Sequence, residues 1–155
     1  MNAPHWHLAL NHLPVVGMLF GVLLLLFAMW RKDDGLIRTC LGVLVLVALT
    51  AVPVYLTGEP SEMAIMDEAD FVEALAEAHK QAASVALTVT LIVGMISGAG
   101  LFAYRKAPAL PRWFNVFVFG GALIASGWLG WTANLGGRIH HPEIRQTGAS
   151  TEAKP

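Results

Sequence analysis

Histidine is the residue type of this sequence with the widest choice of chemistry, and every copy of it borders a long apolar run. Three copies open the chain in the stretch PHWHLALNHLPVVG, a fourth precedes a later apolar run, and two adjacent copies follow the last run. In order, these residues are His5, His7, His12, His79, His140 and His141. A neutral imidazole binds haem iron, copper or zinc, and imidazole also titrates near neutral pH. The six side chains are therefore the candidates for metal binding, quinone binding or proton transfer.

The single cysteine narrows the metal chemistry. Cys40 has no second cysteine to pair with, which excludes an internal disulfide, covalent c-type haem and a zinc site built from thiolates. The chain has 10 basic and 11 acidic residues and a pI near 6.6. This balance gives no indication of nucleic-acid binding.

The apolar runs beside these histidines predict a membrane protein. Hydrophobic residues make up 55% of the 155 residues and charged residues only 14%. A typical soluble domain has about 25% charged residues. Four runs without a charged residue cover positions 13–30, 39–57, 81–104 and 113–137. Each approaches or exceeds the roughly 18–20 residues with which a helix crosses about 30 Å of hydrocarbon.

We therefore predict an all-α integral membrane four-helix bundle with up-and-down topology. Backbone groups in lipid have no water to bond, so the apolar runs must be helical. The spans are expected at about 8–30, 36–56, 80–104 and 113–135, within one membrane domain at 1–141. A soluble bundle would need polar stripes that these runs lack.

The two ends of the chain carry further expectations. No basic segment precedes the first apolar run and no small-residue cleavage site follows it, so the first span is expected to stay as an anchor. Gly136 and Gly137 are expected to end the fourth helix. The polar residues 142–155 are expected to form a disordered tail.

The charges of the loops predict the orientation. Residues 31–38 and 105–112 hold six of the ten basic residues, whereas residues 58–80 hold one lysine and seven acidic residues. The positive-inside rule assigns the two basic loops to the cytoplasm. Both termini and all six histidines are then expected on the exoplasmic side of a bacterial inner membrane.

The acidic loop is expected to lead into the third span as an amphipathic helix. At about 100° per residue, His79 shares a side with Phe71 and Leu75, and Glu73 and Glu77 lie opposite. We therefore expect His79 to face the bundle. The acidic residues are interpreted as a solvated face, or alternatively as a docking patch for a basic periplasmic partner.

The preferred chemistry is a non-covalent b-type haem (haem b) held between spans by His12 and His79 as ligands of the haem iron. Each residue is expected about one turn inside an outward helix end. Neutral imidazoles on different helices of a bundle can hold iron from two sides. Arg138, Lys80 or the spare histidines are the expected partners of the haem propionates.

Other roles for the histidines stay open. His5 and His140 are weighed as further cofactor-binding residues, whereas His7 and His141 are interpreted as amphipathic interfacial residues. The pairs His5-x-His7 and His140–His141 could instead bind copper (Cu) or zinc (Zn). A histidine near the interface could also hold a quinone head group or relay protons.

Small residues at four-residue spacing predict that the helices approach one another closely. These residues are Gly17 and Gly21 in the first span, Gly94 and Gly98 in the third, and Ala122, Ser126 and Gly130 in the fourth.

Three short motifs resemble those of a known family. They are HLPVVG at 12–17, His79 at the head of the third span, and GWLGWTANLGGRIHH at 127–141. They are similar to motifs of a widespread group of bacterial four-span membrane proteins catalogued as a domain of unknown function. The resemblance covers about residues 5–141. Relatives in that group are joined to Rieske-type iron–sulfur or cytochrome c domains, which implies redox work at the outer face with a separate protein as electron partner.

The sequence thus predicts an electron-transfer or accessory membrane subunit rather than an enzyme. The expected role is to pass electrons near the periplasmic face, between the quinone pool and a periplasmic acceptor such as a cytochrome c or an iron–sulfur protein. The alternative is a copper- or zinc-binding subunit, or a purely structural subunit of a larger membrane complex.

Overall fold

The computed structural model describes residues 3–67 and 71–145 of the chain. Within this part the chain is helical and contains no strand, and four of its helices are long. The helices are α1 (Ala3–Leu10), α2 (His12–Arg31), α3 (Asp34–Leu56), α4 (Gly58–Met63), α5 (Glu73–Ala103), α6 (Arg112–His140) and α7 (Pro142–Arg145). The all-α prediction is confirmed.

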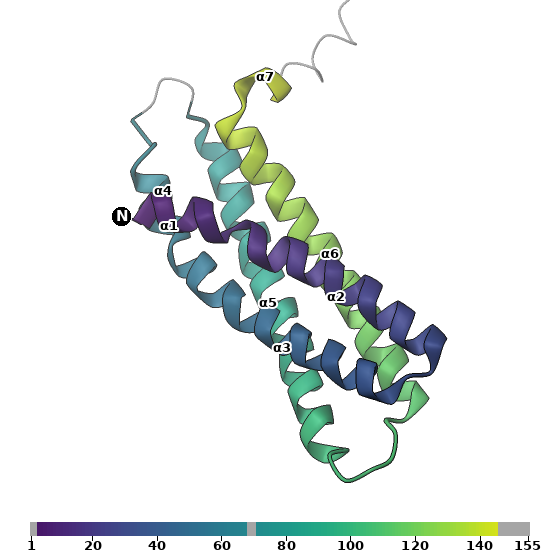
Figure 1. Cartoon of the computed structure of the whole chain (residues 1–155). Helices are drawn as coiled ribbons and strands as arrows, with labels where there is room; N and C mark the ends of the chain where they lie inside the picture. Colours follow the sequence, from purple (N-terminus) through teal and green to yellow (C-terminus); the bar gives the residue numbers. More distant parts are fainter. Residues whose placement is uncertain (1–2, 68–70, 146–155) are drawn as a thin grey trace, which may run out of the picture.

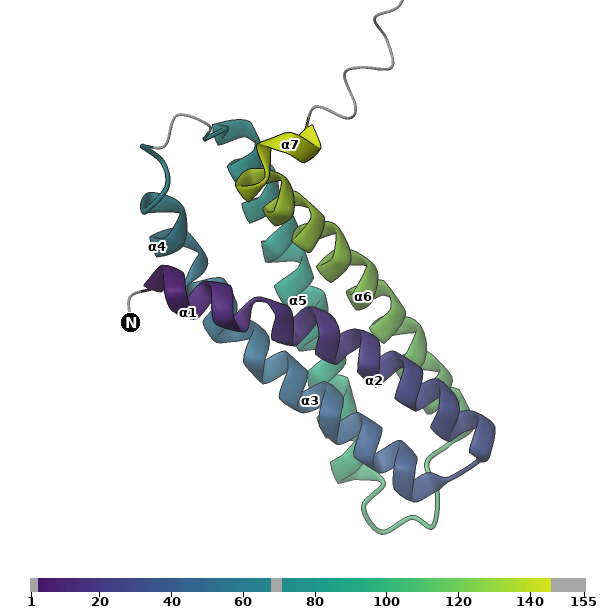
Figure 2. The same ribbon diagram turned by 45° about the horizontal axis from the view of Figure 1, so that its top comes forward.

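The long helices α2, α3, α5 and α6 form an antiparallel four-helix bundle (Figure 1). Each packs mainly against two neighbours in the cyclic order α2, α3, α5, α6, so α2 lies diagonally opposite α5. Figures 1 and 2 show from two directions that α1, α4 and α7 lie at one end of the bundle. The α2–α3 turn and the α5–α6 connection lie at the other end. The predicted up-and-down bundle is therefore observed.

All four long helices are long and apolar enough to cross a membrane. The most apolar 18-residue window of each has a mean hydropathy between 1.5 and 2.4, and no more than a third of any window is buried inside the bundle. Large apolar side chains cover the outside: Val16, Leu46 and Met95 are 63–65% exposed. Water penalises a continuous surface of this kind and lipid does not. The fold is that of a multi-pass membrane protein.

The interior of the bundle combines large apolar side chains with small residues. Met18, Leu25 and Leu44 are fully buried. A Cβ atom on Gly94 of α5 would lie 2.3 Å from the Cβ of Ala48 on α3. The two helices can therefore approach this closely only because residue 94 has no side chain.

The close packing predicted from small residues is found in two of the three patterns. Gly17 and Gly21 of α2 face α3, where a Cβ on either would lie 2.8 Å from a side-chain carbon. Gly98, like Gly94, faces α3, at an ordinary contact distance of 3.6 Å from a valine. On α6, Ala122 is buried, but among the described residues no atom lies within 4 Å of a Cβ on Gly130. The stripe on α6 is therefore only partly an interior surface.

The first span begins with a break between α1 and α2. Pro14 has no backbone N–H and cannot donate to the carbonyl of Leu10, so α1 ends there. Helix α2 restarts at His12, which puts Pro14 in the first turn, where a missing donor costs little. Asn11 occupies the N-cap position, but its side chain makes no capping hydrogen bond.

Asp34 and Arg38 hold together the end of the bundle that carries the basic loops. Arg38 donates from Nε to Asp34 Oδ2 at 2.7 Å, and from its two terminal nitrogens to the carbonyls of Tyr104 and Ala107 at 3.1 and 3.0 Å. Asp34 Oδ1 accepts from the backbone N–H of Leu110 at 2.7 Å. These bonds tie the α5–α6 connection to the first turn of α3.

The fourth long helix extends further than the sequence predicted. The glycine pair at 136–137 lies inside α6, which ends at His140. Glycine in a helix costs about 1 kcal/mol relative to alanine, which neighbouring contacts can offset. Here Arg145 of α7 donates to the carbonyls of Arg138 and Ile139 and so caps the last turn. The expected helix stop at the glycine pair is therefore wrong.

Two other boundaries bear on the predictions. Helix α5 begins at Glu73, well before its apolar run, so the expected amphipathic extension of the third span is confirmed. The tail was expected to be disordered from residue 142, whereas residues 142–145 form α7. Residues 146–155 lie outside the described part.

Candidate metal centre at the histidine end

All six histidines belong to helices or connections at one end of the bundle, where α2 and α5 begin and α3 and α6 end (Figures 1 and 2). We call this the histidine end. The grouping follows from the antiparallel order, because the head of an odd span and the tail of an even span meet at the same end. The predicted grouping is confirmed, whereas the side of the membrane that it faces stays a prediction.

His79 is half-buried on α5 and faces α6, as the helical periodicity predicted. Its Nδ1 lies 3.0 Å from the carbonyl oxygen of Thr132. A carbonyl can only accept, so Nδ1 carries the proton and donates it. In the neutral ring the lone pair is then on Nε2. Hydrogen bonds of this kind to a backbone carbonyl orient the ligand imidazoles of metal sites.

Gly136 makes the contact between His79 and α6 possible. It is the fourth residue after Thr132, so its side-chain position lies beside that carbonyl on the helix surface. A Cβ on Gly136 would lie 3.1 Å from Cε1 and 3.4 Å from Nδ1 of His79. Without a side chain there, the Thr132 carbonyl can accept from His79 with its second lone pair. We call such a carbonyl, together with the glycine four residues later, an imidazole seat.

His7 occupies a second imidazole seat, which the sequence analysis missed. It is half-buried on α1, with Nδ1 3.0 Å from the carbonyl oxygen of Val54 and 3.2 Å from Oγ1 of Thr57. Gly58 is the fourth residue after Val54, and a Cβ there would lie 3.7 Å from Cε1 of His7. His7 is therefore a fixed part of a helix contact, not only an interfacial side chain. The signal was the glycine at position 58, which gains meaning only when the facing helix is known.

The other candidate ligand from the sequence, His12, is exposed in the first turn of α2. Helix α2 is diagonally opposite α5, so the structure places His12 and His79 at the same end but on helices that are not packing neighbours. Their pairing as axial ligands stays a prediction.

The remaining histidines lie at the edge of the same end. His5 is exposed on α1. His140 is the last residue of α6, and its side chain lies outside the described part. His141 is exposed, with Nδ1 2.9 Å from Oε1 of Glu143. A backbone hydrogen bond at Glu143, and then the His141 imidazole, hold the pKa of the Glu143 carboxyl below its ordinary value.

The expected partners of haem propionates are near this end. Arg138 is half-buried on the last turns of α6, and Lys80 is exposed one residue after His79 on α5. Glu73 and Glu77 are exposed on the first turns of α5, opposite its buried alanines, as predicted. The histidine end thus carries these cationic groups together with exposed acidic residues.

The donor set distinguishes two kinds of metal chemistry. Among the described residues, no three or more histidine, cysteine or carboxylate side chains form a group that could hold a metal ion. Copper and zinc sites in proteins use three or four protein ligands. Haem iron needs only one or two, because the porphyrin supplies four nitrogens. Separately seated imidazoles therefore suit haem better than a bare ion.

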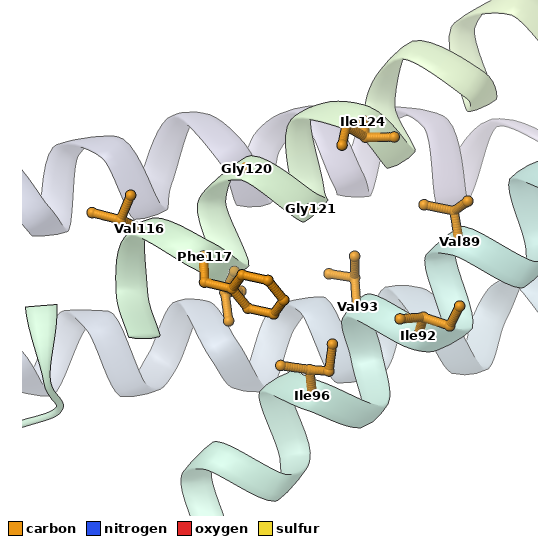
Figure 3. A pocket seen from close by; sticks show the side chains of 10 residues that line it. Val89, Ile92, Val93, Ile96, Val116, Phe117, Gly120, Gly121 and Ile124 are labelled. Atoms are coloured by element: carbon orange, nitrogen blue, oxygen red, sulfur yellow. The ribbon is translucent and has the colours of Figure 1, made fainter. Parts of the chain in front are cut away.

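A hollow of about 390 Å³ lies between α5 and α6, away from the histidines (Figure 3). Its wall consists of valine, isoleucine, phenylalanine and glycine residues, among them Val93, Phe117 and Gly121. Ile92 and Phe117 on its rim are 44% and 60% exposed, so the hollow opens sideways. This hollow has no polar side chain that could bind or activate a substrate. We expect hydrocarbon chains of the lipid to occupy it.

None of the protein-family models, curated proteins or solved structures compared with this chain matches it. The fold and the histidine end therefore define the class by themselves: a multi-pass membrane four-helix bundle with its imidazoles gathered at one end. The family resemblance of the motifs stays a prediction.

Proposed function

We propose that this protein is a membrane electron-transfer protein that binds a b-type haem at the histidine end. His79 and His12 would be the two residues that hold the haem iron. When bound, haem supplies an iron that gains and loses one electron. The observation that carries the proposal is the seat of His79, in which the Thr132 carbonyl holds Nδ1 at 3.0 Å and leaves Nε2 as the ligand atom.

The residues around His79 support a haem more than a bare metal ion. The seat fixes the direction of one imidazole, and haem needs no third protein ligand nearby. Small residues dominate the buried face of α5 beside it, since Ala76, Ala82 and Ala86 are all at most 5% exposed. In this proposal the haem lies against this face, where small side chains offer the least obstruction.

His12 fits the second position less directly than His79 fits the first. It is at the right end of the bundle, and no hydrogen bond holds its side chain among the described residues. The ring is therefore able to turn about its side-chain bonds. In this proposal, Arg138 and Lys80 bind the propionates, because both cations lie within a few residues of the end that carries His79.

The orientation belongs to the same proposal. The basic connections lie opposite the histidine end, and the positive-inside rule puts them in the cytoplasm of a bacterium. The histidine end would then hold the haem near the periplasmic face. The protein would take electrons from membrane quinol and pass them to a periplasmic cytochrome c or iron–sulfur protein, or to another subunit of a membrane complex.

Absorption spectroscopy tests the proposal. The protein is produced with haem precursor, purified in detergent, and measured oxidised and after dithionite reduction. We expect a Soret band and a reduced α-band in the unaltered protein, and a clear decrease of both in His79→Ala. His12→Ala is expected to change a six-coordinate spectrum into a five-coordinate one. His141→Ala is the matched control, because His141 is exposed and contacts only Glu143 in the described part.

Three results would count against the proposal. Colourless protein that takes up no added hemin would end it. Bound copper or zinc by elemental analysis would favour the alternative metal-binding role. A haem spectrum of undiminished intensity in His79→Ala would show that the seated imidazole is not the ligand.

A further inference from the structure

The two imidazole seats share the same geometry. In each, a half-buried histidine donates from Nδ1 to a carbonyl toward the end of a long helix, at 3.0 Å both times. His7 of α1 donates to α3, and His79 of α5 donates to α6. In each, the acceptor is followed four residues later by a glycine that faces Cε1 of the ring. The acceptor–glycine pairs are Val54 with Gly58 and Thr132 with Gly136.

The seats also occupy equivalent places in the chain. His7 lies 47 residues before its acceptor and His79 lies 53 residues before its own. Each pair therefore spans one helical hairpin: α1 to α3 in the first half, and α5 to α6 in the second. One seat could be a coincidence of packing. Two with a carbonyl acceptor for Nδ1, the same glycine spacing and the same end of the bundle indicate a repeated unit. The first seat differs in one detail, since Nδ1 of His7 also lies 3.2 Å from Oγ1 of Thr57.

We infer that His7 is a second metal-ligand residue, equivalent to His79, and that each helical hairpin presents one imidazole for haem. The inference rests on the proposed function for the identity of the ligand. A neutral ring that donates from Nδ1 keeps its lone pair on Nε2, which is the iron-binding atom in both seats. His79 and His12 already account for both protein ligands of the haem in the proposed function, so His7 serves a separate haem.

The position of α1 supports this assignment. Asn11 between α1 and α2 keeps helical backbone angles (φ −59°, ψ −26°), so α1 leads directly into the first span. Helix α1 also packs against α3 and α4 near the His7 seat. A purely interfacial helix needs no such contact. The packing of α1 thus holds His7 against the end of α3, as the packing of α5 holds His79 against α6.

The first test uses the haem-free protein and reads the ring nitrogens directly. With 15N-labelled histidine, we expect His7 and His79 to show a protonated Nδ1 and an unprotonated Nε2 at neutral pH, and His12 to show the ordinary mixture of tautomers. Gly136→Ala is expected to abolish the fixed tautomer of His79. Gly137→Ala is the matched control, since no described atom lies within 4 Å of its Cβ position.

The second test counts haems by hemin titration. We expect two hemin molecules per chain for the unaltered protein, one for His7→Asn, one for His79→Asn, and none for the double variant. Asparagine keeps an N–H donor for the carbonyl but offers no iron ligand, so the fold is retained while binding is lost. Gly136→Ala is expected to weaken one site about 10- to 100-fold, the usual effect of disturbing a hydrogen bond behind a metal ligand.

The outcomes separate the inference from the proposed function. A single hemin per chain that is lost in His79→Asn and kept in His7→Asn would overturn the inference and leave the proposed function standing. No hemin binding at all would overturn the proposed function as well. A protonated Nε2 on His7 in the haem-free protein would also refute its role as a ligand.

Discussion

Gly94 lies at the contact between α3 and α5, and replacing it with alanine tests the packing that positions His79. The new Cβ would lie 2.3 Å from the Cβ of Ala48, whereas carbon atoms in contact are normally about 3.5–4.0 Å apart. Both atoms are attached directly to helix backbones, so no rotamer change can relieve the overlap. The helices must separate by more than an ångström.

The expected cost follows from this overlap. Forcing extra volume into a well-packed core costs typically 1–3 kcal/mol. The better helix propensity of alanine returns up to about 1 kcal/mol. We therefore expect Gly94→Ala to lower the free energy of unfolding by about 1–2 kcal/mol, measured by denaturation in mixed micelles followed by circular dichroism.

Two variants make the test specific. Gly120→Ala on α6 is the matched control, because no described atom lies within 4 Å of its Cβ position, and its stability should be unchanged or slightly higher. Ala48→Gly removes the atom that Gly94→Ala meets. In the double variant the two changes should be coupled by about 0.5–3 kcal/mol, as for residues in direct contact. Equal stability of Gly94→Ala and Gly120→Ala would refute the close approach of α3 and α5.

Two further predictions concern the opposite end and the orientation. Arg38→Ala should lower the free energy of unfolding by roughly 2–3 kcal/mol, because it removes charge-assisted bonds to Asp34 and two carbonyls. Arg38→Lys should recover only part of this stability, since a lysine cannot bond all three acceptors. The measurement is the same denaturation series. Full stability of Arg38→Ala would contradict the proposed contribution of these hydrogen bonds to the fold. In intact cells, an impermeant maleimide should label a cysteine at position 59 and not one at position 106. Labelling only at position 106 would reverse the predicted topology. The native Cys40 is fully buried and should stay unlabelled.

The sequence was sufficient for the parts of the fold that depend on composition and helical period. Four uncharged runs predicted the four long helices, and the antiparallel order then placed all the histidines at one end. The side of α5 that carries His79 also followed from the period alone, because a single helix fixes the angles between its residues. These properties are local, so no knowledge of a neighbouring helix was needed.

The sequence could not predict the helix ends that depend on contacts with distant parts of the chain. A glycine pair followed by a charged residue is a common helix end, yet α6 continues through Gly136 and Gly137. The reason lies in α7, whose Arg145 caps the last carbonyls of α6. Such a cap depends on a segment that folds back, and the local pattern does not contain it.

The imidazole seats show why the sequence predicted the histidines of the candidate site but not the groups that orient them. A histidine at a helix start is seen at once, but the carbonyl that orients it is a backbone group, which every residue has. Only the register between two helices decides which carbonyl it is. At the His79 seat the close contact also depends on Gly136, where a Cβ would lie 3.1 Å from the ring. The local sequences around His7 and His79 differ, yet each ring donates from Nδ1 to a backbone carbonyl of another helix. The equivalence of the two residues therefore belongs to the packing, and the tautomers of their rings are its most direct measure.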